Sequence, residues 1–96
     1  MAAVTYIAPI EGWGSSFSGT LNLPKEFPAA FAQVALNHVL GGYGQIYITG
    51  YSASGNPIEI DGTAVLGISN ADSFSFAGYA DPNGYAFAWL TAYCFE

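Results

Sequence analysis

Charged side chains are scarce in this chain, and positive charge is nearly absent. Only 8% of its 96 residues are Asp, Glu, Lys or Arg, against about 25% in ordinary globular domains. The chain contains one Lys or Arg residue in total, and its formal net charge is −6. Nucleic-acid phosphates and anionic lipids are bound by clusters of Lys and Arg. The composition therefore argues against nucleic acid and anionic membrane surfaces as partners.

Cysteine and histidine are each present once. Cys94 therefore cannot form a disulfide within the chain, and we expect it to be a small apolar core residue. A lone His38 cannot build a multi-histidine metal site or a histidine-paired proton relay. No local signature surrounds a Cys94–His38 nucleophilic pair. We therefore expect no enzyme activity, no metal and no cofactor.

Long apolar runs are also missing, because none approaches the roughly 18 residues that a membrane-spanning helix needs. The N-terminal residues show neither a basic region nor the apolar stretch of a signal peptide. We expect no membrane insertion, and a cytoplasmic or particle-associated location is favoured. The length predicts a single domain over residues 1–96.

What the chain does contain is a series of β-favouring segments separated by turn residues. Residues 4–10 and 15–23 are two of them, and strands near 43–51, 57–60, 63–68, 73–80 and 85–95 indicate an antiparallel meander. Residues 52–56 form the first expected turn. Asp61-Gly62 favours a type I′ hairpin, and 81–84 favours a turn with Gly84 left-handed. In this arrangement each strand pairs with the next.

One segment has helical periodicity, from Pro28 to about Leu40. Pro28 suits the first helical position, and the glycine pair that follows Leu40 suits a helix end. Its apolar residues form a broad face, beside a narrow polar edge of Gln33 and Asn37. The predicted fold is therefore α+β, an antiparallel β-meander sheet with one helix packed on its inner face. The N-terminal strands either join this sheet or form a second layer.

Two carboxylates, Asp61 and Asp81, are predicted at the same end of the meander. Paired carboxylates can perform acid/base chemistry or hold Ca²⁺. Both residues, however, lie in sequences that form turns on their own. We expect the turn role for both.

Aromatic residues make up 17% of the chain, and many alternate with Ser and Thr on the predicted strand face that points away from the helix. Tyr and Trp supply large contact area at low entropic cost, and hydroxyl side chains add adaptable hydrogen bonds. The predicted binding face consists of Tyr43, Tyr47, Tyr51, Tyr79, Phe87, Trp89 and Tyr93. If the N-terminal strands cover this face, the same residues form a second core layer instead.

The uncharged aromatic face favours a non-enzymatic assembly or protein-binding module. Such a module is expected to be a homo-oligomer or a component of a larger particle such as a virion or filament. An alternative is a carbohydrate-binding, lectin-like module in which Trp89, Tyr79 or Trp13 stacks on sugar rings. A further alternative is a small acidic protein inhibitor with a basic target.

Overall fold

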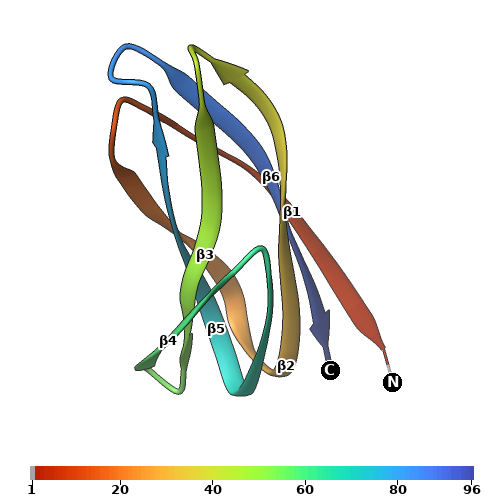
Figure 1. Cartoon of the computed structure of the whole chain (residues 1–96). Helices are drawn as coiled ribbons and strands as arrows, with labels where there is room; N and C mark the ends of the chain where they lie inside the picture. The colour runs from red at the N-terminus through yellow and green to blue at the C-terminus, as the bar shows by residue number, and fades with distance from the viewer. Residues whose placement is uncertain (1) are drawn as a thin grey trace.

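Six antiparallel strands form one continuous sheet in the computed structural model, which describes residues 2–96 (Figure 1). The strands are β1 (Ala3–Trp13), β2 (Phe17–Leu40), β3 (Gly44–Ala53), β4 (Asn56–Gly62), β5 (Ala64–Ala80) and β6 (Tyr85–Phe95). Their order across the sheet is β1-β6-β2-β5-β3-β4. The last strand along the chain therefore lies between the first two.

The long strand β2 gives this sheet its two layers. Residues 17–22 of β2 pair with 73–78 of β5, whereas 29–40 pair with β6. Between these two parts the register shifts, and β2 bends at the lower end of the molecule in Figure 1. β5 bends beside it, where Ser69 and Asn70 have positive φ. Bulged strands that turn a corner let one sheet fold over on itself.

We name the two layers by their strands. Layer A contains β1, β6, residues 29–40 of β2 and residues 64–68 of β5. Layer B contains residues 17–23 of β2, residues 71–80 of β5, β3 and β4. The core fills the space between them.

Small residues on β6 allow the layers to approach closely. Ala86, Ala88 and Ala92 are fully buried, and Leu90 lies among them. A Cβ added to Gly44 of layer B would lie 3.3 Å from the Cβ of Ala86 in layer A. The largest fully buried side chains are Phe27, Phe74, Ile46, Ile48, Leu90 and Cys94. Large side chains of layer B thus pack against a shallow inner face of β6.

The predicted helix from Pro28 to Leu40 is wrong, and with it the α+β class. The segment is the second part of β2, and residues 2–96 contain no helix, hence none that could cross a membrane. Its apolar residues fit a period of two as well as 3.6, with Ala30 and Ala32 buried between more exposed neighbours. Residues 29–33 have strand partners on both sides. Pairing on two sides overrode the helical propensity of the alanines and leucines.

Two predicted hairpins are also wrong. β5 pairs with β3 and β2 instead of β4, and β6 pairs with β1 and β2 instead of β5. Neither Gly62 nor Gly84 has the positive φ that the predicted turns require. Residues 81–84 do form a turn, closed by a hydrogen bond from the Gly84 N–H to the Asp81 carbonyl. That turn carries the chain from layer B to layer A instead of joining neighbouring strands.

Several local predictions are confirmed. The first turn follows β3, with Ala53 opposite Asn56 and positive φ at Ser54 and Gly55. Of the two arrangements left open for the N-terminal strands, β1 adopts the one that joins the sheet, beside β6. Cys94 is fully buried, as expected for a small apolar core residue. Phe74, Phe76, Leu90 and Ala92 also face inward, although β5 and β6 do not pair with each other.

The difference in burial between isoleucines predicts that the same substitution costs more stability in the core than at the surface. Ile48 is fully buried in the core, so Ile48→Ala should lower the free energy of unfolding by about 2–5 kcal/mol. Ile60→Ala is the matched control, because Ile60 on β4 is 43% exposed and a surface change costs roughly 0.5 kcal/mol or less. Urea unfolding measures both. Equal losses for the two variants would contradict the core described above.

Candidate functional site

The outward side of layer A is an aromatic and aliphatic surface that crosses four strands. Cross-strand partners in an antiparallel sheet share a face. From β1 across β6 to β2, the outward rows are Thr5–Tyr93–Phe31, Ile7–Thr91–Gln33, Pro9–Trp89–Ala35, Glu11–Phe87–His38 and Trp13–Tyr85–Leu40. On β5, Leu66 lies opposite Phe31 and Ile68 opposite Ala29. We call this surface the aromatic face.

Large apolar side chains on the aromatic face are open to solvent. Ile7 is 63% exposed, Leu66 53% and Trp89 41%. Trp13, Leu40, Ile68 and Tyr93 are exposed as well. Monomeric proteins seldom expose a connected apolar surface of this kind without a role for it.

Contacts between rings order this face. The ring centroids of Trp13 and Tyr85 lie 4.6 Å apart, and those of Phe87 and Trp89 lie 5.3 Å apart in an edge-to-face arrangement. Phe31 and Tyr93 stack at 6.5 Å. Ring pairs at such separations stabilise one another and limit rotamer freedom. The surface is therefore pre-organised for contact.

Charge is almost absent from the aromatic face. Its outward rows contain one carboxylate, that of Glu11, which accepts a hydrogen bond from the Tyr85 hydroxyl. This hydrogen bond, with burial and the nearby negative charge, raises the pKa of Tyr85 above its usual value. The lone Lys25 lies away from these rows, in the bend of β2, where its Nζ is 2.8 Å from Oε1 of Glu96.

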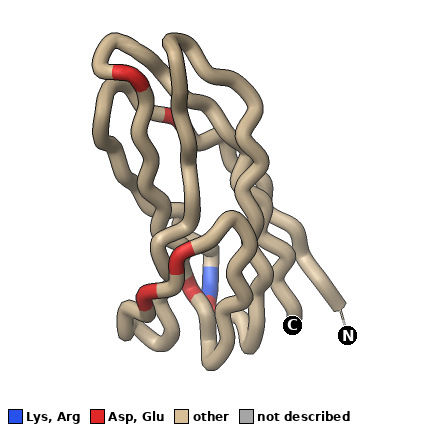
Figure 2. The backbone as a smooth tube through the Cα atoms, in the orientation of Figure 1, with Lys and Arg blue, Asp and Glu red and all other residues tan. Residues whose placement is uncertain are grey.

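The remaining carboxylates lie away from the middle of the molecule. In Figure 2 the acidic positions, drawn in red, lie towards the two ends of the molecule, and the tube between them is tan throughout. The long middle part of each layer is thus free of formal charge. Electrostatic repulsion between copies is weakest there.

The structure divides the predicted binding face between the two layers. Phe87, Trp89 and Tyr93 lie on the aromatic face of layer A. Tyr79 and Tyr47 point outward from layer B, and Tyr43 precedes β3, with its ring 6.2 Å from that of Tyr79. The outward orientation predicted for Tyr51 is wrong. The register shift between Ile48 and Gly50 turns its ring into the core, where it is 6% exposed and packs on Phe74.

Sequence reasoning missed most of the aromatic face. Ile7 lies on β1, whose neighbour could not be identified from the sequence, and Trp13 on the same strand had been named only as a candidate for stacking on sugar rings. Phe31 and Leu40 had been assigned to the helix. The alternation of Thr5, Ile7 and Pro9 was the one available signal that one side of β1 faces outward.

The outward side of layer B is polar, and its rows on β2, β5 and β3 carry no formal charge. Ser18, Thr20 and Asn22 of β2 lie opposite Ala77, Ser75 and Ser73 of β5, and Gln45 of β3 lies opposite Tyr79. Hydroxyl and amide groups therefore replace the Lys and Glu that usually keep strand surfaces hydrated. The two outer surfaces of the molecule differ sharply in character.

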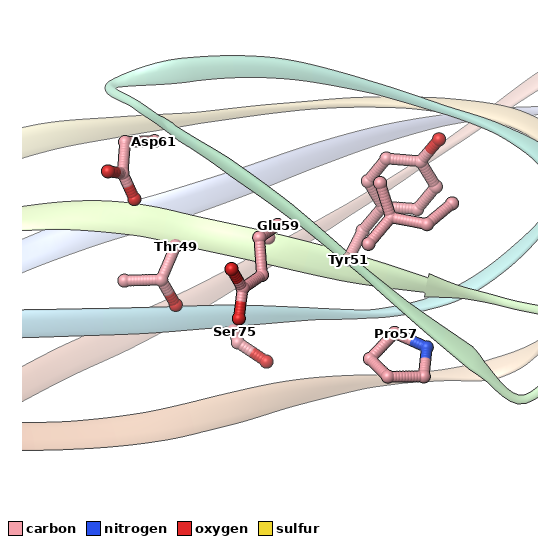
Figure 3. A pocket seen from close by; sticks show the side chains of 8 residues that line it. Thr49, Tyr51, Pro57, Glu59, Asp61 and Ser75 are labelled. Atoms are coloured by element: carbon pink, nitrogen blue, oxygen red, sulfur yellow. The ribbon is translucent and has the colours of Figure 1, made fainter.

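A hollow of about 630 Å³ lies where β3, β4 and β5 meet. Its lining includes Thr49, Tyr51, Pro57, Glu59, Asp61 and Ser75. Gly50 opposes both Glu59 and Ser75 in the sheet, which brings these two side chains to either side of one glycine. Figure 3 shows the Glu59 carboxylate pointing towards Ser75, with Thr49 and Asp61 on the same side of it. Sequence reasoning had missed Glu59 and had assigned Asp61 to a turn.

The other candidate pairs are not brought together. Cys94 is fully buried opposite Ala30, whereas His38 is exposed beside Phe87, farther along the same strands. Asp81 accepts a hydrogen bond from the Gly42 N–H at 3.3 Å, in its predicted turn role. Asp61 instead lies at the hollow. Within residues 2–96, no group of three or more His, Cys, Asp and Glu side chains could hold a metal ion.

Comparison with known proteins leaves the family of the chain open. No protein-family model matches it, and no curated protein matches its sequence. Among solved structures it is similar to one described as "Crystal Structure of FLHE", with 10% identity and a TM-score of 0.38. That match covers 96% of this chain and 98% of the other.

The burial of Cys94 predicts an unreactive thiol. Burial raises the pKa of this thiol, so little of the reactive thiolate is present near neutral pH. Ellman's reagent should therefore label the native protein far more slowly than the urea-unfolded protein. Equal rates in the two states would show that the thiol is open to solvent.

The contact between Glu11 and Tyr85 predicts a coupled titration. Replacing the carboxylate by the neutral amide in Glu11→Gln should lower the pKa of Tyr85 towards its usual value, because the amide holds the phenol proton less strongly. Ring NMR signals followed over alkaline pH measure this shift. An unchanged pKa would mean that the carboxylate does not hold the hydroxyl in solution.

Proposed function

We propose that this protein is a non-enzymatic assembly module whose aromatic face docks on a second copy of the chain. The observation that carries the proposal is the aromatic face itself, an open apolar surface across β1, β6, β2 and β5 with one carboxylate and no Lys or Arg in its outward rows. Aromatic enrichment and depletion of charge are the compositional marks of interface centres.

A second copy is the partner that the charges favour. A basic partner would find one carboxylate on this face, and that carboxylate already accepts a hydrogen bond from Tyr85. An acidic partner would find no cation in the outward rows. A surface with a single formal charge is best matched by another such surface, and the same face on a second copy satisfies this requirement.

The size of the face supports moderate affinity. The larger part of the face is formed by β1, β6 and the second part of β2, which are paired over 11 residues each. At about 3.3 Å per residue and about 4.8 Å between strands, these three strands cover roughly 500 Å² per copy, without the added area of protruding side chains. Two such faces bury about 1,000 Å², near the lower bound for a specific interface. Sheets stack face to face about 10 Å apart with interdigitated side chains, and this geometry suits two aromatic faces.

A lysine on the aromatic face should break the assembly. Trp89→Lys places an ammonium group at the centre of the contact, where it would lose its hydration. We expect self-association to weaken by at least about tenfold, the equivalent of roughly 1.4 kcal/mol. Sedimentation equilibrium over a concentration series measures this change.

Tyr79→Lys is the matched control. Tyr79 is exposed to a similar degree as Trp89, 43% against 41%, but it lies on layer B. This variant should associate like the unmodified chain. A monomeric wild-type protein at every concentration, or equal weakening by both variants, would refute docking through the aromatic face.

Salt dependence gives an independent test. Two copies that each carry a net charge of −6 repel one another, and added salt screens this repulsion with a Debye length of about 10 Å at 0.1 M. Because the face contains almost no opposite charges to be screened, association should strengthen as NaCl rises. Weakening in salt would indicate an interface held by ion pairs.

A further inference from the structure

The hollow between β3, β4 and β5 is a second feature with ligand-binding character, and it lies on the layer opposite the aromatic face. Its volume of about 630 Å³ falls within the range of small-molecule sites. Its lining combines the carboxylates of Glu59 and Asp61 and the hydroxyl groups of Thr49 and Ser75 with the apolar ring of Pro57, and it is bordered by Tyr51 and Ile58, which pack towards the core. We propose that this hollow binds a neutral sugar through two neighbouring hydroxyl groups.

The polar groups suit such a ligand because of their types and their positions. Carboxylates accept hydrogen bonds and form strong ones with hydroxyl donors, whereas Ser and Thr both donate and accept. Glu59 lies beside Ser75 across Gly50, and Thr49 and Asp61 stand on the same side in Figure 3. Adjacent sugar hydroxyls can donate to Glu59 and Asp61 while accepting from Thr49 and Ser75.

The backbone around Gly50 determines which side chains meet at the hollow. The register shifts between Ile48 and Gly50 on both sides of β3, with an extra residue of β3 in the ladder with β5 and an extra residue of β4 in the ladder with β3. A Cβ on residue 50 would collide with the carbonyl oxygen of Ile58, so only glycine lets the two strands lie this close. Bulges re-aim side chains within a sheet. Here the shift brings Thr49 to the same hollow as Glu59 and Asp61.

Other ligand classes fit less well. Two carboxylates repel phosphate, sulfate and acidic sugars. Calcium takes six to eight oxygen ligands at about 2.3–2.6 Å, and the hollow offers two carboxylates and no third acidic residue. Pro57 supplies apolar surface for the C–H side of a sugar ring, which a bare cation does not use.

NMR titration of the isotope-labelled full chain tests the proposal. The methyl glycosides of glucose, galactose and mannose are added separately, with calcium chloride alone as a further arm. At least one glycoside should shift the amide signals of residues 49–51, 58–61 and 75 in a saturable manner. No saturable shift with any glycoside, or shifts confined to other residues, would overturn the proposal.

Neutral isosteres test the carboxylates. Glu59→Gln and Asp61→Asn keep the shape of the hollow and remove its charge, and each should weaken glycoside binding by about tenfold, in line with the loss of one charge-assisted hydrogen bond. Glu11→Gln on the aromatic face is the matched control and should bind normally. Unchanged binding in both hollow variants would overturn the assignment, as would saturable binding of calcium alone with no response to glycosides.

The sugar site and the assembly role can be tested apart. Trp89→Lys should lose self-association and keep the glycoside shifts, because Trp89 and the hollow belong to different layers. Loss of the shifts in this variant, with the fold intact, would show that the hollow needs the assembled state. That result would overturn the hollow as a site complete within one chain.

Discussion

The bend shared by β2 and β5 is the constraint on which the rest of the molecule depends. The two strands stay paired on both sides of the corner, so a single sheet supplies both walls of its own core. Without the bend, Phe74 and Ile48 of layer B would have nothing to pack against, and the alanines of β6 would lie in solvent. Hydrophobic burial between the layers and continuity of the backbone ladder therefore arise from the same local irregularity.

Folding one sheet over also separates two unlike outer surfaces. The outward side of layer A presents rings and aliphatic side chains such as Trp89 and Ile7, and the outward side of layer B presents hydroxyls and amides such as Thr20 and Gln45. Neither surface uses the Lys and Glu coat of most soluble strands. The proposed contacts divide accordingly, with another protein surface on layer A and a hydroxylated small molecule on layer B.

The sequence contained enough to locate β-structure after residue 43, because alternation is a local property. The segments 63–68 and 73–80, predicted as two strands, nevertheless form the single strand β5. The sequence did not show which strands pair with one another. Residues 29–40 satisfy helical and strand periodicity alike, and only the partners on either side decide between them. The hollow was missed for a related reason, since a register shift at Gly50 cannot be read from composition. Trp89 and Phe87 were found because their strand alternates cleanly.

The position of β6 has a consequence for how the protein is made. Layer A has β6 at its centre, between β1 and β2, yet β6 is the last of the six strands to be synthesised. Until residues 85–95 leave the ribosome, β1 has no partner strand and its apolar residues remain exposed to water. Loop closure over almost the whole chain then has to precede the last pairing, which is a slow route for a β protein. The nascent chain must therefore pass through a stage in which a mostly apolar strand, with Glu11 as its one charged residue, is open to chaperones and to other nascent chains.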